Sequence, residues 1–203
     1  MTDRLPIPGA RSVTASLDSD SASRAVVACP PHPQMGGDRR DSRLLAVSDG
    51  LAEIGCACLR FDYGPWDDGR GEQADARNAL AWTRDNFERV GLFGYSFGGA
   101  VAIHAAAELC ATAHDDTPDA VSVLAPAATL SGSSTAAAVP DIDRPLQVLY
   151  GERDDTVDAK PIADCAREHG HAVEALPADH FFVGQQSGVA ESVVAFFDAA
   201  MSA

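Results

Sequence analysis

Three short stretches of the chain carry residue types that perform nucleophilic catalysis. In GYSFG, Ser96 lies between two glycines at the end of an apolar run. GERDDTVD contains three aspartates, and PADHFF contains His180. A serine hydroxyl can attack a carbonyl carbon when a histidine removes its proton and a carboxylate orients that histidine. The chain order serine, aspartate, histidine therefore predicts a catalytic triad.

The residues around Ser96 are those that a nucleophile elbow requires. Gly94 and Gly98 leave space where a predicted strand passes directly into a predicted helix. Such a turn holds the serine in a strained, exposed position, and the helix N-terminus behind it favours developing negative charge. The alternative is an ordinary loop serine, because a serine between glycines is common in turns.

His180 is the preferred base among six histidines because it follows the last predicted strand. His32, in PPHPQMGG, is its competitor at the same edge of the sheet. Of the other four, His104 is assigned to a helix face and His114 to a solvated loop. His169 and His171 flank a predicted helix C-terminus, where a cation is favourable. For the acid, Asp154, Asp155 and Asp158 all follow a strand end, and their alternative role is a solvated acidic loop.

Strand-like and helix-like segments alternate along the chain, which predicts an α/β fold with a mostly parallel, doubly wound sheet and helices on both faces. In such a sheet the loops after the strand ends gather at one edge. The predicted strands are 12–18, 25–30, 56–62, 89–95, 120–126, 145–151 and 171–177. The predicted helices are 42–55, 71–87, 98–110, 159–170 and 189–201. The length suggests one domain, 1–203, in which 1–20 is a tail and an edge strand.

Five stretches, from PPHPQMGG to PADHFF, together resemble the α/β-hydrolase superfamily, and most closely its small esterase and dienelactone-hydrolase-like members. PHPQMGGD resembles the oxyanion loop, LRFDYGP the next strand and turn, GYSFGG the elbow, GERDDTV the acid loop and ADHFF the histidine loop. The resemblance implies Ser96 as nucleophile, Asp154 as acid and His180 as base, with Asp155 and Asp179 as alternative acids. Dienelactone hydrolases carry cysteine at the elbow, so the serine here favours an esterase-like reaction.

An oxyanion intermediate needs two preorganised N–H donors. Phe97, the residue after the nucleophile, supplies one. Pro31 and Pro33 have no N–H, so we expect the second from Gln34, or else from Met35. The residues expected to contact the substrate at this edge are His32, Tyr95 and Trp66.

The connection 127–144 decides what kind of acyl pocket we expect. It is too short for a substantial cap domain, and its Ser, Thr, Gly and Ala content lacks large apolar side chains. We therefore expect a mobile loop, an open site and a preference for small acyl groups. Trp66, in GPWDDGRG, is the bulky side chain expected to overhang this edge.

Composition limits the partners. The formal net charge of −15 disfavours nucleic acids and anionic membranes, and we expect a small-molecule ester as the partner of a monomer or homodimer. No metal or organic cofactor is implied.

The five cysteines are expected to be buried apolar residues, because their number is odd and no zinc spacing is present. The N-terminus has no apolar signal segment, which suggests the cytoplasm.

The sequence therefore predicts a serine hydrolase that cleaves a small carboxylic ester, thioester or lactone through an acyl-Ser96 intermediate. One alternative is a non-catalytic binding protein of the same fold, which a lost triad residue would indicate. The other is an acyltransferase, which uses the same triad and differs only in the acceptor.

The acidic, nearly lysine-free composition resembles that of salt-in halophiles, above all haloarchaea; the alternative is a mildly acidic protein of a GC-rich mesophile. Since dissolved salt screens carboxylate repulsion, we predict that the melting temperature rises steadily as KCl increases from low to molar concentration. Thermal unfolding followed by circular dichroism measures this. A melting temperature that stays flat over the series contradicts the halophile interpretation.

Overall fold

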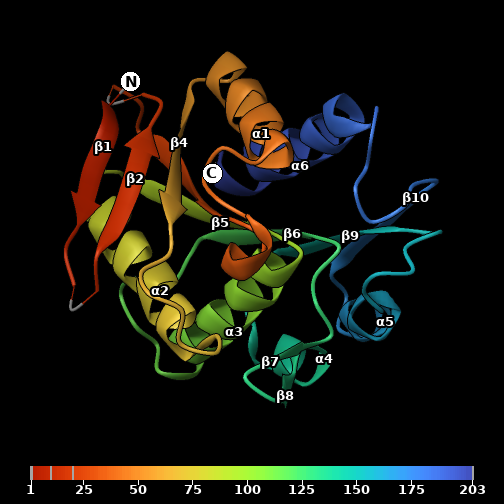
Figure 1. Ribbon diagram of the computed structural model, residues 1–203. Helices are drawn as coiled ribbons and strands as arrows, with labels where there is room; N and C mark the ends of the chain where they lie inside the picture. The colour runs from red at the N-terminus through yellow and green to blue at the C-terminus, as the bar shows by residue number, and fades with distance from the viewer. Residues whose placement is uncertain (1, 10, 20, 203) are drawn as a thin grey trace.

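The computed structural model describes residues 2–9, 11–19 and 21–202, and its main feature is an eight-stranded sheet (Figure 1). The strand order is β1-β2-β4-β3-β5-β6-β9-β10. β1 and β2 are antiparallel to each other, β2 is antiparallel to β4, and the other neighbouring strands are parallel. The strands are β1 Thr2–Ile7, β2 Val13–Leu17, β3 Arg24–Cys29, β4 Cys56–Asp62, β5 Arg89–Tyr95, β6 Ala120–Leu124, β9 Leu146–Gly151 and β10 Ala172–Leu176.

Helices cover both faces of the sheet, as the alternation of segments predicts. The long helices are α1 Ser42–Glu53, α2 Arg70–Arg84, α3 Phe97–Ala111, α5 Lys160–Glu168 and α6 Gln186–Met201. Helices α1 and α6 lie together on one face, and α2, α3 and α5 lie on the other (Figure 1). Each face of the sheet has its own hydrophobic core, and a buried strand contributes to both because successive side chains point to opposite faces. In β3, Val27 belongs to the core under α2 and α3, and Val26 to the core under α1 and α6.

The loops after five of the parallel strands meet at one edge of the sheet and carry the candidate residues. The loop after β3 contains the 3₁₀ helix η1 Pro33–Met35, and the loop after β4 carries Trp66. Ser96 follows β5, Asp154 follows β9 and His180 follows β10. The expectation that these loops gather at the carboxyl edge is therefore confirmed.

Two regions differ from the predictions. The N-terminal segment is more than a tail: residues 2–7 form β1, so β1 is the edge strand and β2 lies inside it. The predicted mobile loop 127–144 has local structure, namely the hairpin β7 Thr129–Leu130 with β8 Ser133–Ser134, α4 Thr135–Ala138 and the 3₁₀ helix η2 Val139–Asp141. Positions 1, 10, 20 and 203 of the predicted domain lie outside the described residues.

The cysteines lie largely in the core. Cys29, Cys56 and Cys58 are buried, and the last two face the same side of β4, as their spacing predicts. Cys110 and Cys165 are half-buried, and burial raises the pKa of both thiols. Within the described part of the chain, no helix is both long and apolar enough to cross a membrane.

Candidate active site

Ser96 lies in a tight turn between β5 and α3. Its φ of 57° and ψ of −118° are strained for a non-glycine residue. The turn requires both flanking glycines: a Cβ on Gly94 would overlap the carbonyl oxygen of Gly98, and a Cβ on Gly98 would overlap the carbonyl oxygens that end β3. The predicted close approach of strand and helix is therefore confirmed.

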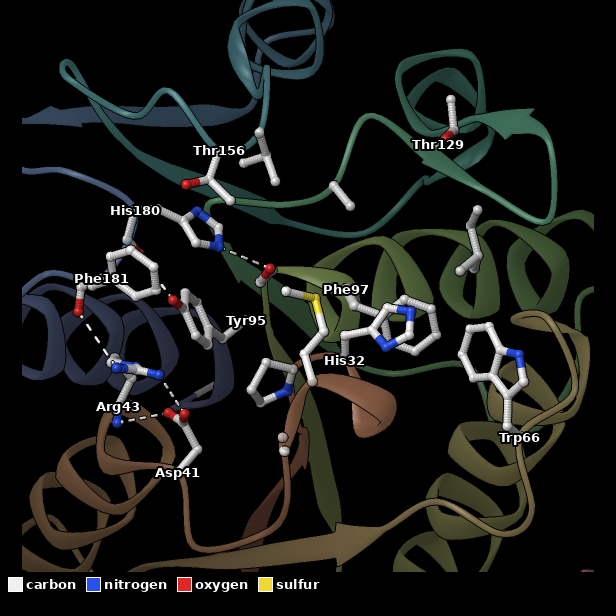
Figure 2. A pocket seen from close by; sticks show the side chains of 18 of the residues that line it. His32, Asp41, Arg43, Trp66, Tyr95, Phe97, Thr129, Thr156, His180 and Phe181 are labelled. Atoms are coloured by element: carbon white, nitrogen blue, oxygen red, sulfur yellow. Dashed lines mark hydrogen bonds and ion pairs between the residues drawn. The ribbon is translucent and has the colours of Figure 1, made fainter.

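The structure brings Ser96, His180 and Asp154 into one hydrogen-bonded chain. Ser96 Oγ lies 3.0 Å from His180 Nε2, and His180 Nδ1 lies 2.7 Å from Asp154 Oδ2 (the serine–histidine contact is the dashed line at His180 in Figure 2). Since a carboxylate only accepts, Nδ1 carries the proton and the lone pair of Nε2 faces the serine. This arrangement can take a proton from Ser96 and stabilise the imidazolium that results.

Asp154 is held in place by the turn that follows β9. Its Oδ1 accepts hydrogen bonds from the N–H groups of Thr156 (2.9 Å) and Val157 (3.0 Å), which leaves Oδ2 for His180. The Asp154 side chain is 3% exposed. The alternative acids Asp155 and Asp179 are exposed, and Asp179 caps the N–H of Phe181 instead.

Tyr95, predicted to contact the substrate, is mainly engaged with His180. Its hydroxyl donates to the His180 carbonyl oxygen at 2.9 Å, and the two rings stack with centroids 5.5 Å apart. Burial raises the pKa of Tyr95 to about 12, so the hydroxyl keeps its proton. On its other side, the Arg43 guanidinium lies 4.5 Å from the ring centroid and pairs with Asp41 (Figure 2). The backbone and ring of His180 are thus both fixed.

The loop after β3 places its donors differently from the prediction. Gln34 N–H donates to His32 Nδ1 at 3.2 Å, and Met35 N–H donates to the His32 carbonyl oxygen at 3.0 Å. Both donors are consumed because His32 caps η1, with Pro33 as its first residue. For the N–H of His32 and that of Phe97, no hydrogen-bond partner is found in the described part of the chain.

His32 does not contact Ser96 as a base. Its ring packs against Trp66 and Phe97, with centroid distances of 4.6 and 4.8 Å. Burial lowers the pKa of His32, which keeps the ring neutral and Nδ1 able to accept from the loop. His32, Trp66 and Phe97 form a continuous wall, called here the aromatic wall (Figure 2).

These residues line a cavity of about 890 Å³ that contains both Ser96 and His180. The aromatic wall lies on one side of His180, and Phe181 and Arg43 lie on the other (Figure 2). The rim is open and apolar: Met35 is 83% exposed and Phe181 is 54% exposed. Ser96 itself is partly accessible to solvent.

Sequence reasoning missed the contributions of two segments to this cavity. Thr129 and Leu130 of β7 line it, although their connection was expected to offer no apolar wall. Arg43, at the start of α1, also lines it. A weak signal was available for Leu130, the sole leucine of a small-residue segment; none marked Arg43. In the described ranges, no group of three His, Cys, Asp or Glu side chains could hold a metal ion.

Residues 66–197 match the dienelactone hydrolase family. The matched segment covers well over half of the chain and contains the serine, aspartate and histidine described above. The loop after β3 lies before it. No curated protein sequence matches the chain significantly.

Solved structures share the fold over nearly the whole chain. An α/β serine hydrolase homologue from Coxiella burnetii is 23% identical, with a TM-score of 0.78 over 96% of this chain and 97% of that one. A dienelactone hydrolase from Anabaena variabilis is 20% identical, with a TM-score of 0.77 over 97% and 96%. Est1E from Butyrivibrio proteoclasticus is 16% identical, with a TM-score of 0.82 over both whole chains. At these identities the likeness shows the fold alone.

Tyr95→Phe tests whether the Tyr95 hydroxyl positions His180. The variant keeps the ring stack and leaves the His180 carbonyl oxygen without its donor. Since such a bond is worth about 1 kcal/mol, we expect kcat for an activated ester to fall roughly two- to tenfold with little change in KM. Tyr150→Phe, which removes a hydroxyl bonded to the surface residue Arg167, is the control. Equal kcat in Tyr95→Phe and the unmodified protein would contradict this role.

Proposed function

The chain belongs to the dienelactone hydrolase family, and on that basis we propose that it hydrolyses carboxylic esters through an acyl intermediate on Ser96. The observation that carries the proposal is the continuous hydrogen-bonded chain Ser96–His180–Asp154 at the bottom of an open cavity. Serine at the elbow, where true dienelactone hydrolases carry cysteine, supports ester cleavage over dienelactone cleavage.

In the proposed first step, Ser96 Oγ attacks the ester carbonyl carbon while its proton moves to His180 Nε2. The carbonyl oxygen becomes an oxyanion, and the free N–H groups of Phe97 and His32 are the candidate donors for it. His32 thus replaces Gln34 and Met35 in the proposal, because their N–H groups are occupied within η1. His180 then protonates the leaving alcohol, and water repeats the sequence on the acyl-serine.

The position of His180 orients the substrate. Because His180 must protonate the leaving oxygen, the alcohol part of the ester lies on the side of Phe181 and Arg43. The acyl part then points away from His180, toward the aromatic wall and Leu130. Phe181 is 54% exposed, so the alcohol can leave the cavity directly into solvent on this side.

The acyl side supports short or planar acyl groups. The aromatic wall offers ring faces for stacking, and Leu130 adds an apolar side chain that is 3% exposed. Ferulic acid, a planar aromatic acid, is bound in a structure of Est1E, which is 16% identical to this chain with a TM-score of 0.81. We therefore extend the proposed small esters to planar aromatic ones.

Two alternatives share the same fold. A non-catalytic binding protein would not need the serine, histidine and carboxylate aligned at hydrogen-bond distance. Acyl transfer would use the same residues with an acceptor other than water. Product analysis with added alcohols and amines separates hydrolysis from transfer.

Ser96→Ala should abolish both ester hydrolysis and labelling by a fluorophosphonate probe while leaving the fold intact. We expect kcat to fall by about 10⁴- to 10⁶-fold, and the losses for Ser96→Ala and His180→Ala should not add, because the residues act as one unit. Asp154→Asn is expected to lose activity, whereas the matched control Asp155→Asn is not. Full labelling of Ser96→Ala would overturn the assignment of the nucleophile.

A panel of p-nitrophenyl esters tests the acyl side. We expect kcat/KM for acetate, butyrate and benzoate to exceed that for laurate and palmitate, since each methylene beyond the wall forgoes about 0.8 kcal/mol of burial. Benzoate should exceed cyclohexanecarboxylate, which has a similar size without a planar ring. If kcat/KM climbs with chain length to palmitate, the site has a deep acyl channel. Equal kcat/KM for benzoate and cyclohexanecarboxylate would exclude stacking on the aromatic wall.

A further inference from the structure

The loop between β4 and α2, residues 63–69, has neither helix nor strand, yet it carries Trp66 of the aromatic wall. A side chain from a distant part of the chain fills the space beneath it. Arg11, between β1 and β2, lies in a slot bounded by Gly64 and Gly71. A Cβ on Gly71 would overlap the Arg11 guanidinium, and a Cβ on Gly64 would lie 3.1 Å from Arg11 Cβ. The absence of both side chains makes room for the arginine.

In this slot Arg11 meets two carboxylates whose side chains have no solvent exposure. Its Nε lies 2.8 Å from Asp75 Oδ1, and its Nη2 lies 3.5 Å from Glu72 Oε1. Nη2 also donates to the Pro65 carbonyl oxygen. Two buried carboxylates without a cation would repel each other and lack solvation. Arg11 is therefore the group that allows Glu72 and Asp75 to be buried beneath the loop.

The same carboxylates hold the main chain of the loop. Asp75 Oδ2 accepts from Gly64 N–H at 2.9 Å, and Glu72 accepts from the N–H groups of Asp67 (3.0 Å) and Gly69 (2.8 Å). Each carboxylate thus links Arg11 to the loop backbone. The loop is fixed on both sides of Trp66 by groups that depend on one guanidinium.

The far end of this network is the acyl side of the cavity. The Trp66 ring lies 4.6 Å from the His32 ring and 5.6 Å from the Phe97 ring. Its Nε1 donates to Asp68 Oδ1 at 3.0 Å, and the Asp68 carbonyl oxygen accepts from Ser131 Oγ at 2.7 Å. A shift of the loop would therefore move Trp66 away from its partners and change the aromatic wall.

We propose that Arg11 is a positioning residue that fixes loop 63–69 through Glu72 and Asp75 and so determines the selectivity of the site for planar acyl groups. The selectivity part rests on the proposed function; the positioning part does not. The triad itself is carried by the loops after β5, β9 and β10, so loss of Arg11 changes the wall and leaves the triad intact.

A fluorescence experiment tests the positioning part without any ester. Trp66 and Trp82 are the two tryptophans of the chain, so Trp82→Phe leaves Trp66 as the sole indole fluorophore. In that background, Arg11→Ala is expected to raise acrylamide quenching of Trp66 toward that of an exposed indole and to lower its anisotropy. Millimolar methylguanidinium should reverse both changes by filling the slot, whereas KCl of equal ionic strength should not.

Arg77→Ala is the matched control, because it removes an arginine from α2 that pairs with Glu108 at the surface. If Arg11→Ala does not fold, the double variant Arg11→Met with Asp75→Asn removes the cation and one carboxylate charge together and keeps an oxygen for Gly64 N–H. It should show the same increase in quenching. Quenching unchanged from the parent in a folded variant of either kind overturns the proposal.

Kinetics test the selectivity part. In Arg11→Ala or the double variant, the ratio of kcat/KM for p-nitrophenyl benzoate to that for acetate should fall by roughly two- to tenfold, the loss expected for one aromatic contact. The change should lie mainly in KM for benzoate, while fluorophosphonate labelling of Ser96 keeps its rate. An unchanged ratio with increased quenching overturns the link to selectivity. If the unmodified protein cleaves no ester, the proposed function fails, and the quenching result still decides the positioning.

Discussion

Only Ser96 separates the end of β5 from the start of α3, and the rest of the carboxyl edge is built around that abrupt turn. The strained backbone of Ser96 costs about 1–3 kcal/mol, which the surrounding packing must offset. The Ser96 N–H donates to the last carbonyl of β6 at 2.9 Å, and Gly98 lies directly against the end of β3. The turn is thus held by the two strands that flank β5, so the serine is presented by the centre of the sheet.

Around this turn, the other groups are fixed mainly through main-chain contacts. Asp154 is capped by two N–H groups of its own turn, and His180 is held through its carbonyl oxygen by Tyr95. His32 is held by the turn that it caps. Each side chain of the site therefore depends on the conformation of its loop, and each loop starts from a strand of the eight-stranded sheet.

Much of the fold could be predicted because its strands are short apolar runs between clear breaks. β4 and β5 have the predicted boundaries, because six of the seven residues in each strand are buried and the flanking loops are more polar. β1 could not be predicted, because TDRLPI contains proline and lacks alternation; pairing with β2 and burial of Ile7 stabilise the strand in the fold. The hairpin of β7 and β8 has two residues in each strand, too few for a pattern.

In the candidate site too, local sequence features could be predicted and contacts between distant segments could not. The order and strand-end positions of Ser96, Asp154 and His180 are local features, and a sequence displays them. In the loop after β3, the expected donors Gln34 and Met35 are occupied, because possession of an N–H does not show where that N–H bonds. Proline after a capping residue is the sequence signal of this turn. Arg11 gave no signal at all, because its partners lie more than 50 positions away and only the folded sheet brings them together.

The open rim has a consequence for what becomes of the proposed acyl-serine. With Met35 and Phe181 exposed and Ser96 partly accessible, bulk water reaches the ester bond of the intermediate without any segment having to move. Water is the most abundant nucleophile, so a competing alcohol or amine must be bound near His180 to intercept the acyl group. In concentrated salt, where water activity is lower, partition of the proposed intermediate between hydrolysis and transfer would shift toward such acceptors. The solvent composition, and not only the protein, would then influence the fate of the proposed acyl group.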